Sequence, residues 1–298
     1  MTTTDRWAEW VLRTRHGGDP ARHADAMGVL GRVRDRVLDA AAPASGETVL
    51  DVGCGDGLLS FAALDRVGPA GTVVFSDVSE PLLDHCRDTA AGLGVADRCR
   101  FVHTWLPELA AVPDGSVDVV VLRSVLMYVR DKPACLRSLH RVLRPGGRLS
   151  LFEPVNGFGF PEPPDRLWTF DVGQPPEVRE LADRVVAATH VDRPADDPIL
   201  DYDERDLLAA AEAAGFTELA LTYEARVGTD VGFGLTRVPF REMLDIAPNP
   251  TSPTYGELLD RALDPAERER LVAHLEAQPP ERRRGRLALA YLCAHRTP

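Results

Sequence analysis

One nine-residue stretch constrains the fold of this chain more than any other, because residues 49–57 read VLDVGCGDG. Strand-forming residues run directly into three glycines at alternate positions. Glycine lets the backbone turn sharply and lets a ligand approach the peptide groups closely. From Leu58 the apolar residues recur at helical spacing, so the stretch predicts a strand, a tight turn and a helix whose N-terminus faces the turn.

Two acidic residues narrow the ligands that such a turn could hold. Asp77 ends the next apolar run, close to the spacing of about 20 residues at which a carboxylate reaches ribose hydroxyls. Asp51 precedes the first glycine, where its charge would repel a pyrophosphate and favour an ammonium or sulfonium group. Leu58 stands where a dinucleotide fingerprint requires its third glycine. Both Asp51 and Leu58 therefore argue against a nicotinamide-dependent oxidoreductase, which stays open as an alternative.

These features, in this order, resemble the class I S-adenosylmethionine-dependent methyltransferases of the bacterial small-molecule or natural-product type. VLDVGCGDG resembles the first motif of the family, Asp77 the acid that ends its second strand, and LRPGG at 143–147 the turn before its fifth strand. The resemblance is strong over 46–154 and weaker elsewhere. It implies an α/β fold with a Rossmann-like seven-stranded, mostly parallel sheet and helices on both faces.

The resemblance and the composition of the remaining chain predict four regions. Residues 1–45 form an N-terminal helical cap, and 46–154 form the S-adenosylmethionine-binding core. Residues 155–202 are rich in proline, glycine and aromatic residues and predict a lid or substrate insertion. Residues 203–298 complete the core and carry a helical insertion at 228–285. We expect an α-helical lid built from the N-terminus and the two insertions.

Local patterns predict the individual elements. Proline and N-cap residues mark helix starts, glycine marks helix ends, and unbroken apolar runs mark buried parallel strands. By analogy with the family, the last strand is antiparallel. The expected helices are 21–42, 58–67, 79–92, 132–143, 176–189, 203–215, 240–247 and 255–277, and the expected strands are 49–52, 72–77, 99–102, 117–122, 148–153, 216–227 and 287–294.

The resemblance implies a cofactor site for S-adenosylmethionine, which leaves as S-adenosylhomocysteine. The glycines of the turn allow close approach, Asp51 lies near the positively charged methionine end, and Asp77 binds the ribose hydroxyls. The family usually places a polar residue against the adenine amino group after the third strand, and here Thr104 or a backbone group would serve while Trp105 covers the ring. The expected cofactor-binding residues are Asp51, Gly53, Cys54, Gly55, Gly57, Asp77, Val78, Thr104, Trp105 and Arg123.

Methyl transfer from a sulfonium is an in-line displacement, so the protein must chiefly hold the acceptor in line and exclude water. A general base helps only if the acceptor arrives protonated, and a carboxylate acceptor needs none. His16, Tyr128 and Glu153 are the candidates for a catalytic base, by their positions in the cap or near strand ends, although each also suits a structural role. Asn156, after the fifth strand, is a weaker candidate for the same role.

Charge and cysteine content restrict the partners. The net charge of −12 disfavours nucleic acid and anionic membranes, because phosphate contacts need lysine and arginine. The first ten residues lack an apolar signal core, and no run of about 18 apolar residues predicts a membrane span. The five cysteines include no CxxC pair, which predicts reduced thiols, a cytoplasmic location and no metal site.

The leading hypothesis is methyl transfer to an oxygen, nitrogen or carbon of a small-molecule acceptor, of the kind made in secondary metabolism. Methylation of a carboxylate on a peptide or protein is the alternative within the same chemistry. A cofactor-binding protein without transferase activity and a nicotinamide-dependent oxidoreductase are the alternatives from other classes. The sequence predicts neither the acceptor atom nor the oligomeric state.

Overall fold

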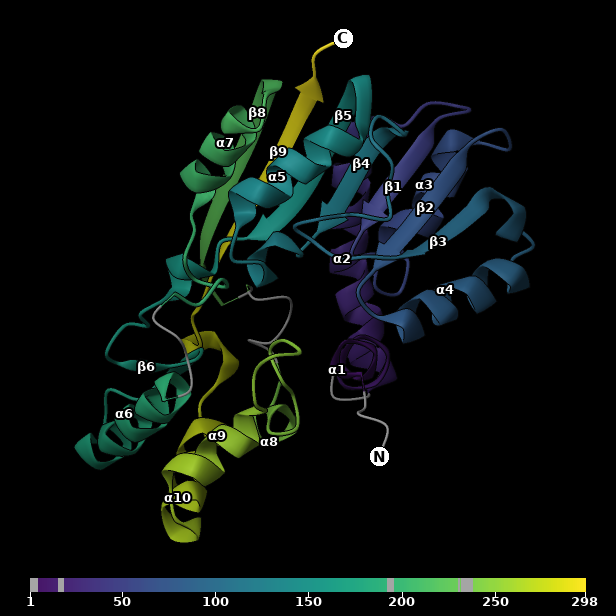
Figure 1. Ribbon diagram of the computed structural model, residues 1–298. Helices are drawn as coiled ribbons and strands as arrows, with labels where there is room; N and C mark the ends of the chain where they lie inside the picture. The colour runs from purple at the N-terminus through teal and green to yellow at the C-terminus, as the bar shows by residue number, and fades with distance from the viewer. Residues whose placement is uncertain (1–4, 16–18, 192–195, 230, 232–237) are drawn as a thin grey trace.

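The computed structural model of the protein describes residues 5–15, 19–191, 196–229, 231 and 238–298. Within these ranges, seven strands form one sheet in the order β3-β2-β1-β4-β5-β9-β8 (Figure 1). Strands β1 to β5 are parallel, whereas β9 runs antiparallel to both β5 and β8. The predicted seven-stranded, mostly parallel sheet is confirmed. The strands are β1 (Thr48–Val52), β2 (Thr72–Asp77), β3 (Cys99–His103), β4 (Val117–Arg123), β5 (Leu143–Pro154), β8 (Phe216–Gly228) and β9 (Gly285–Arg296).

Helices cover both faces of the sheet, as predicted. Buried apolar side chains of α2, α3 and α4 form one core with one face, and those of α5 and α7 form a second core with the other face. Strand β4 lies between the two cores, which explains its almost unbroken apolar sequence VDVVVL. The helices are α2 (Pro20–Ala41), α3 (Leu58–Val67), α4 (Glu80–Gly92), α5 (Lys132–Val142) and α7 (Glu204–Ala213).

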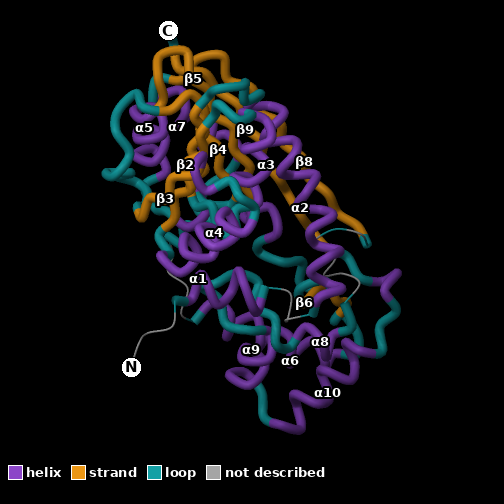
Figure 2. The backbone as a smooth tube through the Cα atoms, turned by 90° about the vertical axis from the view of Figure 1, so that its right-hand side faces the viewer, coloured by secondary structure: helices purple, strands orange, loops and turns teal. Residues whose placement is uncertain are grey.

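A second lobe lies beyond the carboxyl ends of the parallel strands (Figures 1 and 2). It is built from residues 166–190 and 240–276, which come from the two predicted insertions. Its core is separate and includes the fully buried Phe170, Phe240 and Leu271. The elements of the second lobe are β6 (Arg166–Leu167), β7 (Phe170–Asp171), α6 (Pro176–His190), α8 (Phe240–Met243), α9 (Tyr255–Ala262) and α10 (Pro265–Glu276).

Some helices differ from their predicted bounds. The single helix predicted over 255–277 is two helices, because Asp264 caps α10 by accepting hydrogen bonds from two backbone amides and Pro265 cannot donate to α9. The helix predicted over 240–247 ends at Met243. Near the N-terminus, α1 (Arg6–Glu9) continues as a π-helical turn at Trp10–Thr14. Short 3₁₀ turns occur at Ala96–Arg98, Leu126–Tyr128, Asn156–Gly159 and Pro280–Arg282.

A bilayer-crossing helix needs both length and a continuous apolar composition. Across the described ranges, none of the helices combines these two properties.

Candidate functional site

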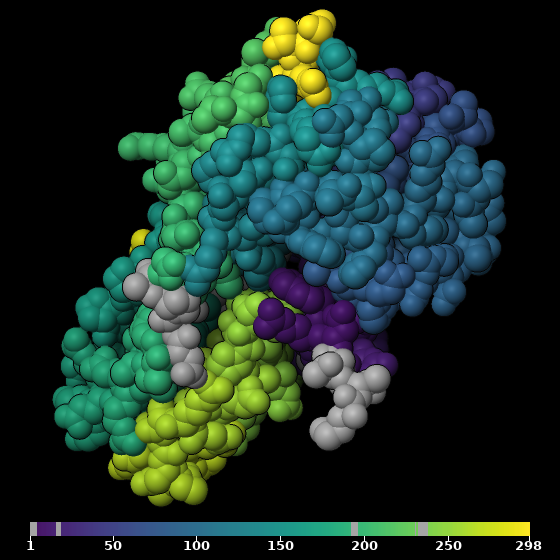
Figure 3. All heavy atoms as spheres, in the orientation of Figure 1, coloured from purple at the N-terminus to yellow at the C-terminus, as the bar shows by residue number. Residues whose placement is uncertain are grey.

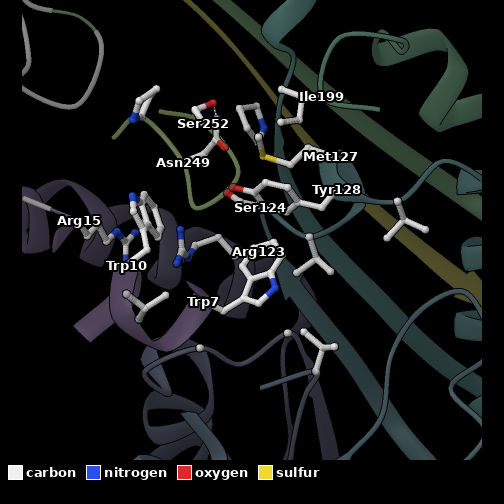
Figure 4. A pocket seen from close by; sticks show the side chains of 18 of the residues that line it. Trp7, Trp10, Arg15, Arg123, Ser124, Met127, Tyr128, Ile199, Asn249 and Ser252 are labelled. Carbon is white, nitrogen blue, oxygen red and sulfur yellow. Dashed lines mark hydrogen bonds between the residues drawn. The ribbon is translucent and has the colours of Figure 1, made fainter. Parts of the chain in front are cut away.

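A cavity of about 680 Å³ lies at the carboxyl ends of the parallel strands, between the sheet, residues 5–15 and the second lobe (Figure 4). Open α/β sheets bind ligands at this edge, where the strand order reverses, here between β1 and β4. The volume lies within the range of about 300–1,000 Å³ that small-molecule sites take. Seven of the expected cofactor-binding residues line the cavity: Gly53, Gly55, Asp77, Val78, Thr104, Trp105 and Arg123.

The glycine turn forms one wall of this cavity. Gly53 has a φ of +68°, and a Cβ atom there would lie 2.6 Å from a methyl carbon of Val125. Gly57 has a φ of +85° and stands at the N-cap of α3, behind the wall, where a Cβ atom would lie 2.5 Å from the ring of Phe61. The turn therefore requires glycine at both positions, for its backbone angles and for the close packing behind it.

Asp51 and Cys54 lie behind the glycine turn and not on the cavity wall. The Asp51 carboxylate is 2% exposed and accepts a hydrogen bond of 2.5 Å from the Ser60 hydroxyl on α3. Burial raises the pKa of Asp51 to about 7. A hydrogen bond with Cys86 and burial raise the pKa of the Cys54 thiol. Both side chains hold the turn against the helices behind it, and Asp51, which was expected near the methionine end of the cofactor, is not among the residues that line the cavity.

Asp77 joins the end of β2 to the glycine turn. One carboxylate oxygen accepts a hydrogen bond of 2.9 Å from the Gly55 amide, and the other accepts one of 2.9 Å from the Ser79 amide. Burial raises the pKa of Asp77, while these backbone donors favour its ionised form. The carboxylate lines the cavity and retains lone pairs, so it can accept further hydrogen bonds from hydroxyl groups of a ligand.

Two large apolar side chains stand exposed next to Asp77. Val78 is 47% exposed and Trp105 is 55% exposed, and both line the cavity. Thr104, which precedes Trp105, is buried and donates its backbone N–H to the Asp77 carbonyl at 3.1 Å. An exposed indole face beside a valine can cover a flat ring, as aromatic stacking requires.

The N-terminal segment, residues 5–15, closes the opposite side of the cavity. The Trp7 ring meets the Tyr128 ring edge-on, with 4.8 Å between centroids. The Trp10 indole N–H donates a hydrogen bond of 2.9 Å to the Ala247 carbonyl in the second lobe. Figure 3 shows the two segments in contact below the sheet. Residues far apart in the sequence therefore meet over the cavity.

Charged side chains gather between this segment and the glycine turn. The Arg15 guanidinium lies 3.9 Å from the Asp56 carboxylate and 5.2 Å from the centre of the Trp10 ring. Burial and the charge of Arg123 lower the pKa of Arg15 to about 10. Among the described residues, Arg123 has no ion-pair partner within 4 Å. Two guanidinium groups, of Arg15 and Arg123, and the Asp56 carboxylate thus line this part of the cavity.

Glu153 is wholly buried behind the cavity wall. Its carboxylate accepts hydrogen bonds from the backbone amides of Val125, Leu126 and Met127 at 2.8, 2.8 and 3.2 Å. Burial raises its pKa to about 7. The loop that it holds begins at Ser124, whose φ of +56° is a strained conformation for a residue with a side chain. Glu153 therefore positions this loop and does not face the cavity as a base would.

The structure places the three candidate bases differently. Tyr128 lines the cavity, Glu153 does not, and His16 lies outside the described residues. Burial and the charge of Glu153 raise the pKa of the Tyr128 phenol. Asn156 also lines the cavity and donates a hydrogen bond of 3.4 Å to the Ile199 carbonyl.

Sequence reasoning missed the far wall of the cavity. The apolar and proline-rich character of the two insertions predicted a pocket, but no local motif indicated which of their residues reach it. Ser124 and Asp56 were also missed, although both adjoin predicted site residues. The missed wall residues include Asp56, Ser124, Met127, Ile199, Leu200, Ile246, Ala247, Pro248, Asn249 and Ser252.

Comparisons with known proteins point to one family. A family model described as a methyltransferase domain matches residues 43–182. Nocamycin O-methyltransferase of Saccharothrix syringae is 39% identical over 173 residues, 56% of this chain and 58% of that protein. The ubiquinone/menaquinone biosynthesis C-methyltransferase UbiE of Escherichia coli O1:K1 / APEC is 35% identical over 116 residues, 39% of this chain and 46% of that protein. The chain spans about half the length of these curated relatives.

Solved structures agree with the fold. Geranyl diphosphate methyltransferase in complex with SAM matches with a TM-score of 0.52 and 18% identity, over 96% of both chains. Geranyl diphosphate C-methyltransferase from Streptomyces coelicolor A3(2) matches with a TM-score of 0.51 and 17% identity, over 89% of this chain and 76% of that one. Residues 43–182 are thus similar to a methyltransferase domain, and the seven-stranded sheet has the fold of these solved methyltransferases.

Proposed function

We propose that this protein binds S-adenosylmethionine in the cavity and transfers its methyl group to a small, largely apolar acceptor, leaving S-adenosylhomocysteine. The observation that carries the proposal is the joint placement of the glycine turn and the Asp77 carboxylate on one cavity wall. The names of two relatives, an O-methyltransferase and a C-methyltransferase of quinone biosynthesis, support a small-molecule acceptor.

The residues on the wall fit the cofactor group by group. The Asp77 carboxylate would accept the ribose hydroxyls, with Gly55 and Ser79 holding it in place. The adenine would lie against the exposed faces of Val78 and Trp105. A glycine turn without side chains lets the remainder of the molecule approach the backbone at the N-terminus of α3.

The amino-acid end of the cofactor carries one positive and one negative group. Asp56 and Arg15, which lie 3.9 Å apart on the cavity wall, offer one charge of each sign. We assign the ammonium group to Asp56 and the carboxylate to Arg15, because opposite charges attract strongly in a cavity with little water. Arg15 belongs to the N-terminal segment, so binding at this end would also fix that segment over the site.

S-adenosylmethionine supplies a methyl group that is already activated by the sulfonium charge. The chain must therefore align the acceptor and exclude water. The N-terminal segment performs the second task in our proposal, with Trp7 packed on Tyr128 and Trp10 bonded to the Ala247 carbonyl. Deletion of residues 1–18 should lower turnover strongly and change the free energy of unfolding only a little. Unchanged turnover in the truncated protein would refute the cap.

Trp10→Phe is a milder test of the same cap. It removes the indole N–H that reaches Ala247 and keeps an aromatic ring beside Arg15. We expect turnover to fall by about threefold to tenfold, since a hydrogen bond contributes about 0.5–1.5 kcal/mol. Trp105→Phe, which changes an indole on the proposed adenine side and leaves the cap contact intact, should instead weaken the binding of the cofactor.

The transfer itself is tested with donor labelled in its methyl group. The protein is incubated with labelled S-adenosylmethionine and a panel of apolar acceptors, and mass spectrometry follows S-adenosylhomocysteine and labelled product. We expect both to form in equal amounts and only when an acceptor is present. Tight binding of the donor with no product from any acceptor would favour a binding protein, and preferential binding of NADH would favour an oxidoreductase.

A further inference from the structure

We infer that the acceptor group of the proposed reaction is a carboxylate, which enters the cavity already ionised and is held by Arg123, Ser124 and Tyr128. The inference rests on the proposed function and adds the chemical class of the acceptor. Three observations support it. The described wall offers no suitable base, the Arg123 guanidinium has no ion-pair partner within 4 Å among the described residues, and the rest of the cavity wall is mostly apolar.

The described wall lacks a group suited to remove a proton from an acceptor. Its ionisable members are Arg6, Arg15, Asp56, Asp77, Arg123 and Tyr128. Asp77 is engaged by two backbone amides and Asp56 faces Arg15. The raised pKa of the Tyr128 phenol keeps it protonated near neutral pH, so it donates a hydrogen bond and does not act as a base. An alcohol, phenol or ammonium acceptor would therefore find no base among these described groups.

Hydrogen-bond donors converge where the acceptor would lie. Arg123 and Ser124 are adjacent at the end of β4, and both line the cavity together with Tyr128, whose phenol senses the charge of Arg123 (Figure 4). Arg123 has no acidic partner within 4 Å among the described residues. Asp51 behind the turn senses the charge of Arg123 but lies too far away for an ion pair. A half-buried guanidinium without an ion-pair partner in contact, on a wall with two hydroxyls, favours an anion with two oxygens.

Arg15 and Arg123 have different partners, which separates the two ends of the cavity. Arg15 already faces Asp56, and this pair suits the amino acid of the cofactor. Arg123 lies on the side of Tyr128, Met127 and the second lobe. A carboxylate at Arg123 could still belong to the cofactor, and the experiment below distinguishes these two sources.

The remaining wall indicates what carries the carboxylate. Beyond Tyr128, side chains of the two insertions and of neighbouring segments form a mostly apolar surface, to which Asn156, Asn249 and Ser252 add the polar groups. Such a surface buries hydrocarbon and offers little to a sugar or a peptide backbone. We therefore expect a lipophilic acid. The apolar side chains on this part of the wall are Met127, Val129, Phe160, Ile199, Leu200, Ile246, Ala247, Pro248 and Leu287.

The transfer to a carboxylate balances without a base. A lone pair of the carboxylate oxygen forms the new bond to the methyl carbon, while the bond from that carbon to sulfur breaks and its electron pair stays on sulfur. The products are a neutral methyl ester and a neutral thioether, and no proton moves. Arg123 loses its anionic partner in this step, which would weaken the binding of the ester relative to the acid.

The first test compares matched acceptors. Decanoic acid, decanol and decylamine share one chain, and phenylbutanoic acid and phenylbutanol share another. With labelled donor, we expect methyl esters of the acids and no product from the alcohols or the amine. Product from an alcohol or the amine would overturn the inference, whether or not His16→Gln abolishes it. No product from any probe, while S-adenosylhomocysteine still binds, would also count against it.

The second test measures binding and needs no turnover. Arg123→Met and Tyr128→Phe are titrated calorimetrically with decanoic acid in the presence of S-adenosylhomocysteine, and with S-adenosylhomocysteine alone. Arg144→Met is the control, since Arg144 pairs with Asp118 near the opposite end of β4. We expect Arg123→Met to weaken the acid by about 30-fold or more and Tyr128→Phe by about tenfold. The affinity for S-adenosylhomocysteine should stay within about threefold.

Methylthioadenosine, which lacks the amino acid, separates the two carboxylate sources. If Arg123→Met weakens S-adenosylhomocysteine and leaves methylthioadenosine unchanged, Arg123 binds the cofactor and the inference is wrong. If the wild-type protein binds neither nucleoside, the proposed function itself fails.

Discussion

Replacing Gly53 and Gly55 separately with alanine distinguishes two reasons for glycine in the turn. Both residues have positive φ angles, of +68° and +57°, so alanine is strained at either position. They differ in what surrounds them. A Cβ atom on Gly53 would lie 2.6 and 3.3 Å from the two methyl carbons of Val125, whereas a Cβ atom on Gly55 would have no neighbour within 4 Å.

The expected magnitudes follow from this difference. The left-handed conformation costs alanine about 1–2 kcal/mol at each position. Overpacking against Val125 adds about 1–3 kcal/mol for Gly53→Ala alone. The free energy of unfolding should thus fall by about 2–5 kcal/mol for Gly53→Ala and about 1–2 kcal/mol for Gly55→Ala. For ligand affinity the order reverses, because the new methyl group of Gly55→Ala would occupy space that the cofactor approaches.

Denaturant unfolding and calorimetric titration with S-adenosylhomocysteine measure the two effects. Combining Gly53→Ala with Val125→Ala should recover the overpacking energy and leave the conformational strain, which a double-mutant cycle isolates. Equal destabilisation by the two alanines, or no recovery in the double variant, would refute the packing argument. Unchanged affinity in Gly55→Ala would refute the placement of the cofactor against the turn.

Three further predictions concern buried carboxylates. Asp77→Ala should weaken the binding of S-adenosylhomocysteine by about 100-fold or more in calorimetry, because the two hydrogen bonds from the ribose to this carboxylate contribute about 1.5–3 kcal/mol each. Ser79→Ala removes only the side-chain cap of α4 and keeps the backbone amide that holds Asp77, so it should leave the affinity unchanged. Glu153→Ala should lower the free energy of unfolding by about 3 kcal/mol or more, because three backbone amides lose their acceptor, and a loss below about 1 kcal/mol in denaturant unfolding would contradict the positioning role. Asp51 has a pKa of about 7 in the folded protein, against an ordinary value of 3.8. Between these two pH values the folded state binds more protons than the unfolded state. The free energy of unfolding that Asp51 contributes therefore falls as the pH rises from about 4 to about 7. The free energy of unfolding of Asp51→Asn, relative to the wild type, should therefore increase over this range, and parallel pH profiles would contradict the assignment.

The sequence was sufficient for those parts of the fold that local patterns encode. The glycine turn after a short apolar strand and the unbroken run of β4 predicted a parallel sheet covered on both faces, and the sheet is as predicted. The spacing from the turn to Asp77 placed that carboxylate at the end of β2, where it does line the cavity.

Side-chain direction at strand ends could not be predicted in this way. Glu153 and Asp51 were proposed to face the site because of their positions along the chain. In the fold, the Glu153 side chain points towards three backbone amides of the loop that follows β4, and the Asp51 side chain points towards Ser60 on α3. Both directions depend on which partner the neighbouring element offers, and that partner is fixed only by tertiary packing.

Contacts between distant segments were equally inaccessible. The bond from the Trp10 indole to Ala247 joins residues 237 positions apart. The π-helical turn at Trp10–Thr14 belongs to a short segment, whose conformation depends on packing more than on helical propensity. Much of the wall opposite the glycine turn comes from two insertions without a repeating pattern, so only the three-dimensional arrangement shows that Ile199 and Ser252 line the same cavity as Tyr128.

Calorimetric titration of the protein with S-adenosylhomocysteine, with NADH as the comparison, tests the central claim most directly. The cavity at the end of the parallel strands predicts one site per chain with a micromolar dissociation constant, and no heat from NADH. The absence of heat with S-adenosylhomocysteine, or tighter binding of NADH, would contradict the assignment of the glycine turn and Asp77 to a methyl donor.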